Sequence, residues 1–177
     1  DQAMSEFEVY GYEAYRQRIY EDLRPADGAT RADFDGDRLT EYMIKLRRVK
    51  PNLVNVGEER LLETQGMTKG GVPTIAGLLM LGSYPQQFFP QMSITAVVVQ
   101  GKNIGDVGQR GERFVDNKRF EGTISQMLDG ALQFVQRHMT VKTIIGDDGQ
   151  RADESEYPIK AVRELLLNAL IHRDYSI

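Results

Sequence analysis

The segment YPIKAVRELLLNALIHRDYSI, residues 157–177, carries the groups whose types and spacing could do chemistry. Glu164, Asn168 and His172 recur every four residues, so they share one side of a predicted helix. The residues that flank this polar stripe are apolar, namely Ala161, Leu165, Leu167 and Ile171. The pattern predicts a helix that is covered on both sides, with a narrow polar seam inside. A buried carboxylate and amide need partners, and a bound ion with an anionic ligand would supply them.

Simpler interpretations remain open for the same residues. Glu164 and Asn168 could face water, as polar side chains on helices usually do. His172 lies near the end of the helix, where the helix dipole favours a cation, so it is more simply a terminal charge than a ligand. We expect the side that bears Leu167, Asn168 and Ile171 to form an exposed patch or a contact with another chain.

Short helices dominate the elements predicted for the first half of the chain. Ser5 and Glu8 have the spacing of a capping box and begin the first helix. Asp37 is expected to cap the second helix, and Pro73 to begin the last one, which Gly82 ends. The predicted helices cover residues 4–20, 38–49, 57–67 and 73–81.

The second half mixes strands with helices. SITAVVVQG is nearly continuous in β-branched and apolar residues, which favours a buried strand over residues 93–101. A glycine-bearing loop over 102–118 and a short strand at RFEG lead to a helix. Its apolar positions follow helical spacing, at Ile124, Met127, Leu128, Ala131, Leu132 and Val135. Asp148-Gly149 indicates a hairpin, and Pro158 is expected at the first position of the final helix.

These elements predict an α+β fold, with a helical N-terminal half followed by a small sheet and its packed helices. We expect two regions, a mostly helical connecting region at 1–90 and an α+β region at 91–177. We also expect the chain to be an inner segment of a longer protein, because it begins DQAM rather than at an initiator methionine.

Composition excludes several classes of function. The chain has 177 residues and no cysteine, which excludes disulfides and thiol catalysis and favours the reducing cytoplasm. Only two histidines are present, His138 and His172, so a zinc site is not expected. The net charge of −4 disfavours general binding to nucleic acid by this chain, and no apolar run is long enough to span a membrane.

Four stretches resemble parts of the RecG-like transcriptional regulators, which are often labelled as ATP-dependent DNA helicase-related. YPIKAVRELLLNALIHRDYS and VPTIAGLLMLGSYPQQFFP, residues 72–90, carry the resemblance most strongly, and RFEGTISQMLDGALQFV adds to it. Members of that family have a Schlafen/AlbA-type DNA-binding domain followed by a region similar to the GHKL ATPases, such as gyrase and the histidine kinases. AMSEFEVY, residues 3–10, resembles the join after the DNA-binding domain.

The resemblance implies roles for the polar stripe. Glu164 and Asn168 match the Glu and Asn of the GHKL N-box, in which Asn holds the Mg²⁺ of ATP and Glu positions water. An amide oxygen suits Mg²⁺, and a nearby carboxylate can orient a nucleophilic water. The family's later glycine-rich boxes, which hold adenine and phosphates, would follow Ile177. Mg-ATP binding is therefore expected only of the intact parent, with no cofactor in this chain.

We predict a non-catalytic scaffold or regulatory segment that joins and orients the DNA-binding and GHKL-like parts, with DNA bound by another domain and with self-association. A Mg-ATP-dependent switch is the first alternative.

A module that binds DNA directly through 45–50, KLRRVK, and 102–119 is the second alternative. Gly101, Gly105, Gly108 and Gly111, with Arg110, Arg113 and Arg119, could also hold a phosphate, although a plain surface loop explains them too. Tyr84, Phe88 and Phe89, next to Pro85 and Pro90, could form a partner groove or pack in the core.

Overall fold

The computed structural model describes residues 20–99, 101, 106–108, 111–145 and 151–175. The chain divides into two compact units, unit 1 with Asp1–Gly82 and Asp174–Ile177, and unit 2 with Ser83–Arg173. Both units contain helices and antiparallel strand pairs, so the predicted α+β class is confirmed. The predicted regions 1–90 and 91–177 stay a prediction, and the helix expected from Ser5 and Glu8 lies outside the described residues.

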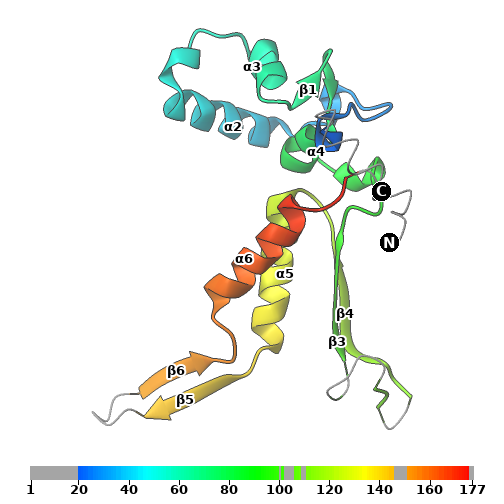
Figure 1. Cartoon of the computed structure of the whole chain (residues 1–177), viewed down its shortest axis with the longest axis vertical. Helices are drawn as coiled ribbons and strands as arrows, with labels where there is room; N and C mark the ends of the chain where they lie inside the picture. The colour runs from blue at the N-terminus through cyan, green and yellow to red at the C-terminus, as the bar shows by residue number, and fades with distance from the viewer. Residues whose placement is uncertain (1–19, 100, 102–105, 109–110, 146–150, 176–177) are drawn as a thin grey trace, which may run out of the picture. The chain divides into compact units, whose positions relative to one another are not determined.

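Unit 1 is built from short helices and one pair of short antiparallel strands (Figure 1). In chain order its elements are η1 Glu21–Leu23, η2 Arg31–Asp33, α2 Gly36–Val49, η3 Pro51–Leu53, α3 Glu58–Thr64, β1 Thr68–Lys69, β2 Val72–Pro73 and α4 Ile75–Leu81. The core side chains include Leu61 and Leu62 of α3 with Ile75, Leu78 and Leu79 of α4, all of them buried. Burial of these apolar side chains is what drives such short helices to form.

Helix α2 was predicted with the wrong N-cap. Asp35, and not Asp37, caps it, because an Asp35 carboxylate oxygen accepts a hydrogen bond from the backbone N–H of Arg38 at 3.0 Å. Asp37 lies inside the first turn, where its charge favours the helix N-terminus without capping it. Two aspartates two positions apart therefore gave two possible caps, and the sequence prediction took the second one, while the predicted end at Val49 is confirmed.

Thr74 joins the β1–β2 hairpin to α4. Its hydroxyl oxygen accepts from the N–H of Gly77 at 2.9 Å and donates to the carbonyl of Gly66 at 2.6 Å. The side chain is completely buried, so both bonds are made out of water. Pro73 was expected to begin the helix but belongs to β2, and Thr74 is the N-cap.

The glycines of the PTIAGLLMLG stretch allow close backbone approach. A Cβ on Gly77 would lie 2.0 Å from the carbonyl oxygen of Met67, and one on Gly82 would lie 2.5 Å from the carbonyl oxygen of Leu78. Gly82 ends α4 with φ −67°, which any residue can adopt. Glycine is needed there because a side chain would not fit against Leu78, and not because the backbone is left-handed. The stretch that carries the strongest resemblance is thus a packing motif of unit 1.

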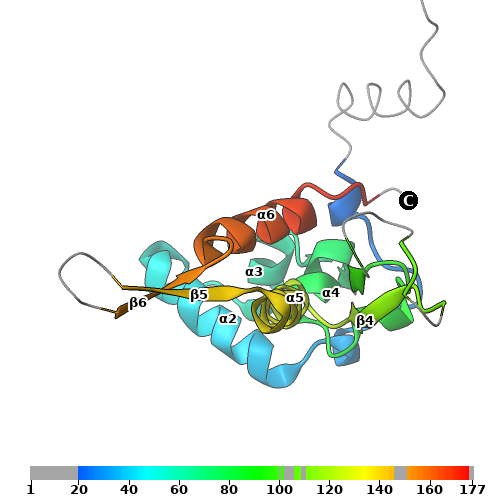
Figure 2. The same ribbon diagram turned by 90° about the horizontal axis from the view of Figure 1, so that it is seen from below.

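Unit 2 consists of two antiparallel hairpins and two longer helices (Figures 1 and 2). Its elements are η4 Pro85–Gln87, β3 Ile94–Val99, β4 Phe114–Phe120, α5 Ile124–His138, β5 Val141–Ile145, β6 Arg151–Ser155 and α6 Ile159–Ile171. Strand β3 pairs with β4, and β5 pairs with β6. Helix α5 packs on the β3–β4 hairpin, and α6 packs on α5.

The prediction of a buried strand at 93–101 was wrong in one respect. Strand β3 exists, but only Ile94, Ala96 and Val98 pack towards the buried Phe120 and the α5 core. Thr95 and Val97 on the other face are exposed. The continuous apolar run therefore describes a strand with one covered face in a two-stranded sheet. Its partner β4 begins at Phe114, inside the segment predicted as a loop.

Gln86 connects η4 to the start of α5. Its side-chain amide nitrogen donates to the carbonyls of Met92 at 2.7 Å and Gly122 at 2.9 Å. Its amide oxygen accepts from the N–H of Gly122 at 2.7 Å. Gly122 has a φ of +102°, which favours glycine. Thr123 then caps α5 in a capping box with Gln126.

The last two elements agree with the sequence prediction in type. The expected hairpin is formed by β5 and β6, while its Asp148-Gly149 turn lies outside the described residues. The predicted final helix is α6. Pro158 is its N-cap residue rather than its first helical residue, a difference of one position.

Candidate functional site

Helix α6 is the element that positions the predicted site residues, and its inner side fixes its orientation. Leu170 is buried, and Leu166 packs against the cluster of Phe120 and Phe134. Arg163 lies 3.7 Å from Asp129 of α5. These contacts place the opposite side of α6 outward.

Arg173 holds the C-terminal end of α6. Its guanidinium donates to the carbonyls of Gln91 at 2.8 Å and Ser93 at 3.3 Å, just before β3. An arginine fork can hold two carbonyls at once, so it fixes the helix end in both position and rotation. The Arg of the HRDY stretch therefore has a structural role in unit 2.

Glu164 and Asn168 lie together on the outward side of α6, as the spacing predicted, and both are exposed. The expected polar seam inside a covered helix is therefore absent from the described chain, because nothing in it covers this side. The alternative, in which both groups face water, describes the structure. Each side chain keeps its oxygen atoms accessible to a ligand from outside.

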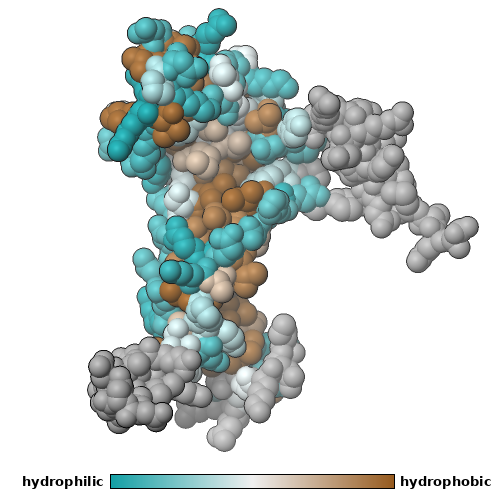
Figure 3. Space-filling view, turned by 60° about the vertical axis from the view of Figure 1, so that its left-hand side comes forward, coloured by the Kyte–Doolittle hydropathy of each residue, from teal (hydrophilic) through white to brown (hydrophobic). Residues whose placement is uncertain are grey.

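Apolar residues flank this polar pair and are exposed as well. The exposed fraction is 70% for Leu165 and 52% for Ile171, while Leu167 is half-buried. Figure 3, in which the α6 side of unit 2 comes forward, shows hydrophobic residues in brown beside polar residues in teal. Of the side predicted to form an exposed patch or a contact with another chain, Asn168 and Ile171 are exposed and Leu167 is half-buried, so the choice between the two stays a prediction. We call Glu164, Leu165, Asn168 and Ile171 the α6 outer face.

His172 is the C-cap residue of α6, and its N–H donates to the carbonyl of Asn168 at 2.9 Å. This is the place that the terminal-charge interpretation predicted. Among the residues that the structure describes, no group of three or more His, Cys, Asp or Glu side chains could hold a metal ion. A cation on the α6 outer face would therefore need ligands from outside the described chain, such as phosphate oxygens.

The basic run 45–50 is partly engaged within unit 1. Lys45 forms an ion pair of 2.8 Å with Glu41, and the hydrogen bond from this ammonium lowers the pKa of the Glu41 carboxyl. Lys50 donates to the side chain of Gln65 at 3.1 Å. The run ends α2, where cations favour the helix dipole. Direct DNA binding through it stays a prediction.

The glycine-bearing stretch 101–119 divides into a turn and a strand. Gly101 and Gly111 have positive φ values of 79° and 81°, and the N–H of Gly108 donates to the carbonyl of Glu112 at 2.8 Å. Gly105 and Arg110 lie outside the described residues. Arg119, one of the arginines that could hold a phosphate, bonds the Pro90 carbonyl and lies 2.8 Å from Glu121.

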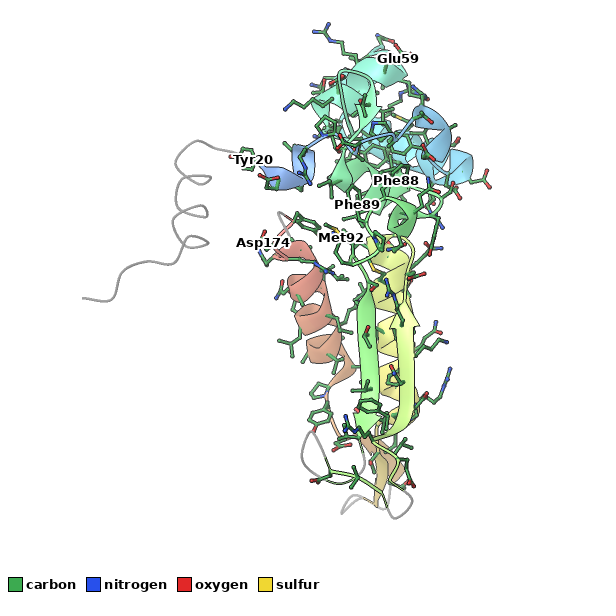
Figure 4. The ribbon with its side chains drawn as sticks, turned by 90° about the vertical axis from the view of Figure 1, so that its right-hand side faces the viewer. Tyr20, Glu59, Phe88, Phe89, Met92 and Asp174 are labelled. Carbon is green, nitrogen blue, oxygen red and sulfur yellow. The ribbon has the colours of Figure 1, made fainter. Side chains whose placement is uncertain are left out.

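The aromatic cluster is neither a closed core nor a defined groove. Phe88 and Phe89 are half-buried, with ring centroids 6.3 Å apart (Figure 4). Tyr84 is exposed, and its hydroxyl donates to Glu121 at 2.9 Å, which raises the pKa of the phenol. The buried members of the segment are Pro85 and Gln86. The choice between partner groove and core packing therefore stays open.

Sequence reasoning missed several hollows, including one on each unit. One, of about 400 Å³, lies on unit 1 and is lined by Arg31, Glu59, Arg60, Leu62, Glu63, Thr68 and Gly71 (Glu59 is labelled in Figure 4). Arg31 forms an ion pair with Glu58, and Glu63 accepts from the N–H of Gly71 at 2.9 Å. Its charges of both signs leave no net preference for a ligand. The other hollow lies between β4 and α5 of unit 2.

Comparisons with known proteins bear on the fold. A domain family of unknown function, DUF8451, matches residues 12–95, which is less than half of the chain. No curated protein matches. One similar solved structure is that of the DIP2311 protein from Corynebacterium diphtheriae, with a TM-score of 0.52 and 23% identity. The match covers 99% of this chain and 32% of that one, so the chain spans about a third of that protein's length.

Within residues 20–99, 111–145 and 151–175, none of the helices combines the length and the apolar character that a bilayer crossing needs.

Proposed function

We propose that this chain is a non-catalytic connecting segment of a RecG-like transcriptional regulator, in which it joins and orients a DNA-binding domain and a GHKL-like domain. The α6 outer face is the observation that carries the proposal. Leu165 and Ile171 are exposed there beside Glu164 and Asn168, on a helix whose other side is fixed by Leu166 and Leu170. Exposed apolar residues grouped on a fixed helix are typical of a contact surface.

The motif residues support a role in packing rather than in chemistry. Thr74 and Gly77 join α4 to the β1–β2 hairpin, Gln86 joins η4 to α5, and Arg173 holds the end of α6. The side chains of Thr74, Gln86 and Arg173 form hydrogen bonds within their own units. At Gly77, the missing side chain lets the backbone of Met67 approach within unit 1. A segment in which these motif residues serve internal contacts, while Glu164 and Asn168 face outward, is suited to hold other parts in place.

The length of the similar structure is consistent with a segment of a larger protein. This chain spans 32% of the DIP2311 chain. The DNA-binding partner, the GHKL-like partner, self-association and a cytoplasmic location all belong to the proposal, and they rest on the resemblance of residues 3–10, 72–90 and 157–176.

Replacement of Leu165 by glutamate should weaken self-association of this chain at least about tenfold, because a charge on the contact surface must be desolvated when it is covered. Leu165 is 70% exposed, so the free energy of unfolding should change by no more than about 0.5 kcal/mol. Sedimentation velocity over a range of concentrations measures the association, and circular dichroism in urea measures the stability.

The matched control is Ile44→Glu, which places the same charge at a comparably exposed apolar position on α2. Ile44→Glu should self-associate with the same affinity as the unsubstituted chain. If the unsubstituted chain sediments as a monomer at every concentration, assembly through the α6 outer face is contradicted. The same holds if both variants weaken self-association equally.

A Mg-ATP-dependent switch in the intact parent is the second candidate, and one observation favours it. Glu164 and Asn168 are both exposed on the same side of α6, where a nucleotide-bound Mg²⁺ could reach the amide oxygen. When bound, Mg²⁺ would neutralise phosphate charge, Asn168 would hold the ion, and Glu164 would orient water.

Isothermal titration of this chain with Mg-ATP should give no heat if the connecting role is correct. Asn168→Ala is the control, because it removes the proposed ligand from an exposed position without disturbing the inner side of α6. Binding heat that the unsubstituted chain gives with Mg-ATP and that Asn168→Ala does not give would support the switch and overturn the non-catalytic role.

A further inference from the structure

A row of facing side chains follows the seam between β4 and α5. On β4, Asp116, Lys118 and Phe120 alternate with residues of the other face, so they lie on the same side. On α5, Gly130, Gln133, Phe134, Arg137 and His138 follow helical spacing and face that side. All of these residues belong to unit 2, so the seam is formed within one compact unit.

The inner end of the seam is apolar and tightly packed. The rings of Phe120 and Phe134 meet edge to face, with centroids 5.9 Å apart, and both side chains are buried. A Cβ on Gly130 would lie 2.5 Å from a ring carbon of Phe120, so only glycine lets this ring lie against the helix. Phe120, Gly130 and Phe134 form the apolar part of the lining of a hollow between β4 and α5.

This hollow has a volume of about 120 Å³ and a rim of hydrogen-bond donors. Lys118 and Arg137 come from different elements, and Gln133 lies one helical turn before Arg137. Lys118 stands 5.5 Å from the centre of the Phe120 ring. Within the described part of the chain, neither cation has a carboxylate partner.

The nearest acid on the same side of β4 is already bonded. A carboxylate oxygen of Asp116 lies 2.8 Å from the ring nitrogen of His138, whose ring contacts Phe134 at 4.6 Å. Asp116 is therefore paired with His138, and it is not among the residues that line the hollow. The chain has a net charge of −4, yet the lining of this hollow carries two cations and no acid.

We infer that the hollow between β4 and α5 binds a phosphate group. Lys118 and Arg137 offer only donors, and the amide of Gln133 adds further donors. Phosphate is an acceptor-only anion with several oxygens, so it can accept from all three side chains at once, and hydrogen bonds between charged partners are the strong kind. Arg137 also lies near the C-terminus of α5, which favours a cation there, but the helix dipole does not explain why Lys118 of β4 lines the same hollow.

Titration of the ¹⁵N-labelled chain with inorganic phosphate, followed by NMR, tests this inference. We expect the chemical-shift changes to be concentrated at Lys118, Gln133 and Arg137. The double variant Lys118→Gln/Arg137→Gln should bind inorganic phosphate at least tenfold more weakly. Both residues are exposed, so this variant should keep the parent circular dichroism spectrum. The control Lys69→Gln/Lys160→Gln removes the same charge from exposed positions outside the hollow and should bind within twofold of the parent.

Two further probes identify the source and the class of the anion. A short single-stranded DNA that shifts the same residues, and loses affinity in the same variant, identifies the phosphate as one of a nucleic-acid backbone. Binding of inorganic phosphate alone identifies a free phosphate group. Shifts spread over other residues, equal weakening by the control variant, or succinate binding as tightly as phosphate would each overturn the inference.

Discussion

Replacement of Gly77 by alanine should destabilise unit 1 by about 2 kcal/mol or more. The new Cβ would lie 2.0 Å from the carbonyl oxygen of Met67, a distance that real Cβ atoms do not reach. This oxygen cannot move away freely, because it accepts from the backbone N–H of Thr74 at 3.0 Å and the Thr74 hydroxyl lies 3.3 Å from it. Alanine favours a helix over glycine by about 1 kcal/mol, which offsets only part of an overpacking cost of about 3 kcal/mol.

Gly36→Ala is the matched control for this prediction. Gly36 is also helical, at the start of α2, and nothing lies within 4 Å of a Cβ placed there. Alanine should therefore stabilise the chain by about 0.5 to 1 kcal/mol, mostly by restricting the unfolded state. Urea unfolding followed by circular dichroism measures both changes, and hydrogen exchange shows whether the loss in Gly77→Ala is confined to unit 1. Equal stability of the two variants would disprove the close contact at Met67.

The second large effect is expected at Gln86. Gln86→Met keeps the length of the side chain but leaves the Met92 carbonyl and both backbone groups of Gly122 without their partner. Gln86 is only 3% exposed, so water cannot easily replace the lost bonds. Each buried group left unpaired costs about 1 to 3 kcal/mol, and the sum should be about 3 kcal/mol or more for unit 2.

Gln86→Glu separates donor loss from acceptor loss. The introduced carboxylate can still accept from the Gly122 N–H, but it faces two carbonyl oxygens to which it cannot donate. Burial and these carbonyls raise the pKa of the introduced group in the folded state. Its protonated form is therefore favoured by folding, so the loss of stability should be largest above that pKa and should shrink as the pH falls.

An exposed glutamine of the same unit provides the comparison for both variants. Gln136→Met, on the outer side of α5, should change the free energy of unfolding by no more than about 0.5 kcal/mol. If Gln86→Met unfolds at the same urea concentration as Gln136→Met, the three hydrogen bonds of Gln86 do not stabilise unit 2.

Local signals in the sequence were sufficient for several elements. The apolar spacing from Ile124 to Val135 predicted α5, and Asp148-Gly149 between extended stretches predicted the β5–β6 pair. In both cases neighbouring residues in the chain carry the whole pattern. Strand β4 was mostly missed, because FVDNKRF is rich in polar residues and its only buried side chain, Phe120, is at its end. Its strand conformation depends on pairing with β3, which the spacing of its own residues does not show.

For the candidate site too, the sequence predicted what depends on spacing along one helix but not what depends on other elements. Helical spacing placed Glu164 and Asn168 on one side of α6, but whether that side is covered depends on the neighbours of the helix. Those neighbours proved to be Phe120, Phe134 and Asp129, all on the opposite side. The hollow at Lys118, Gln133 and Arg137 joins a strand to a helix, so the residue spacing within either element alone does not indicate it.

Strands β3 and β4 have different exposed edges. Among the described residues each pairs with the other alone, so each leaves one row of backbone N–H and carbonyl groups without a strand beside it. Strand β4 carries Asp116, Lys118 and Arg119, whose charges discourage a further strand from joining. Strand β3, ITAVVV, has no charge and is mostly β-branched, so growth of the sheet by a segment of another molecule should begin at β3.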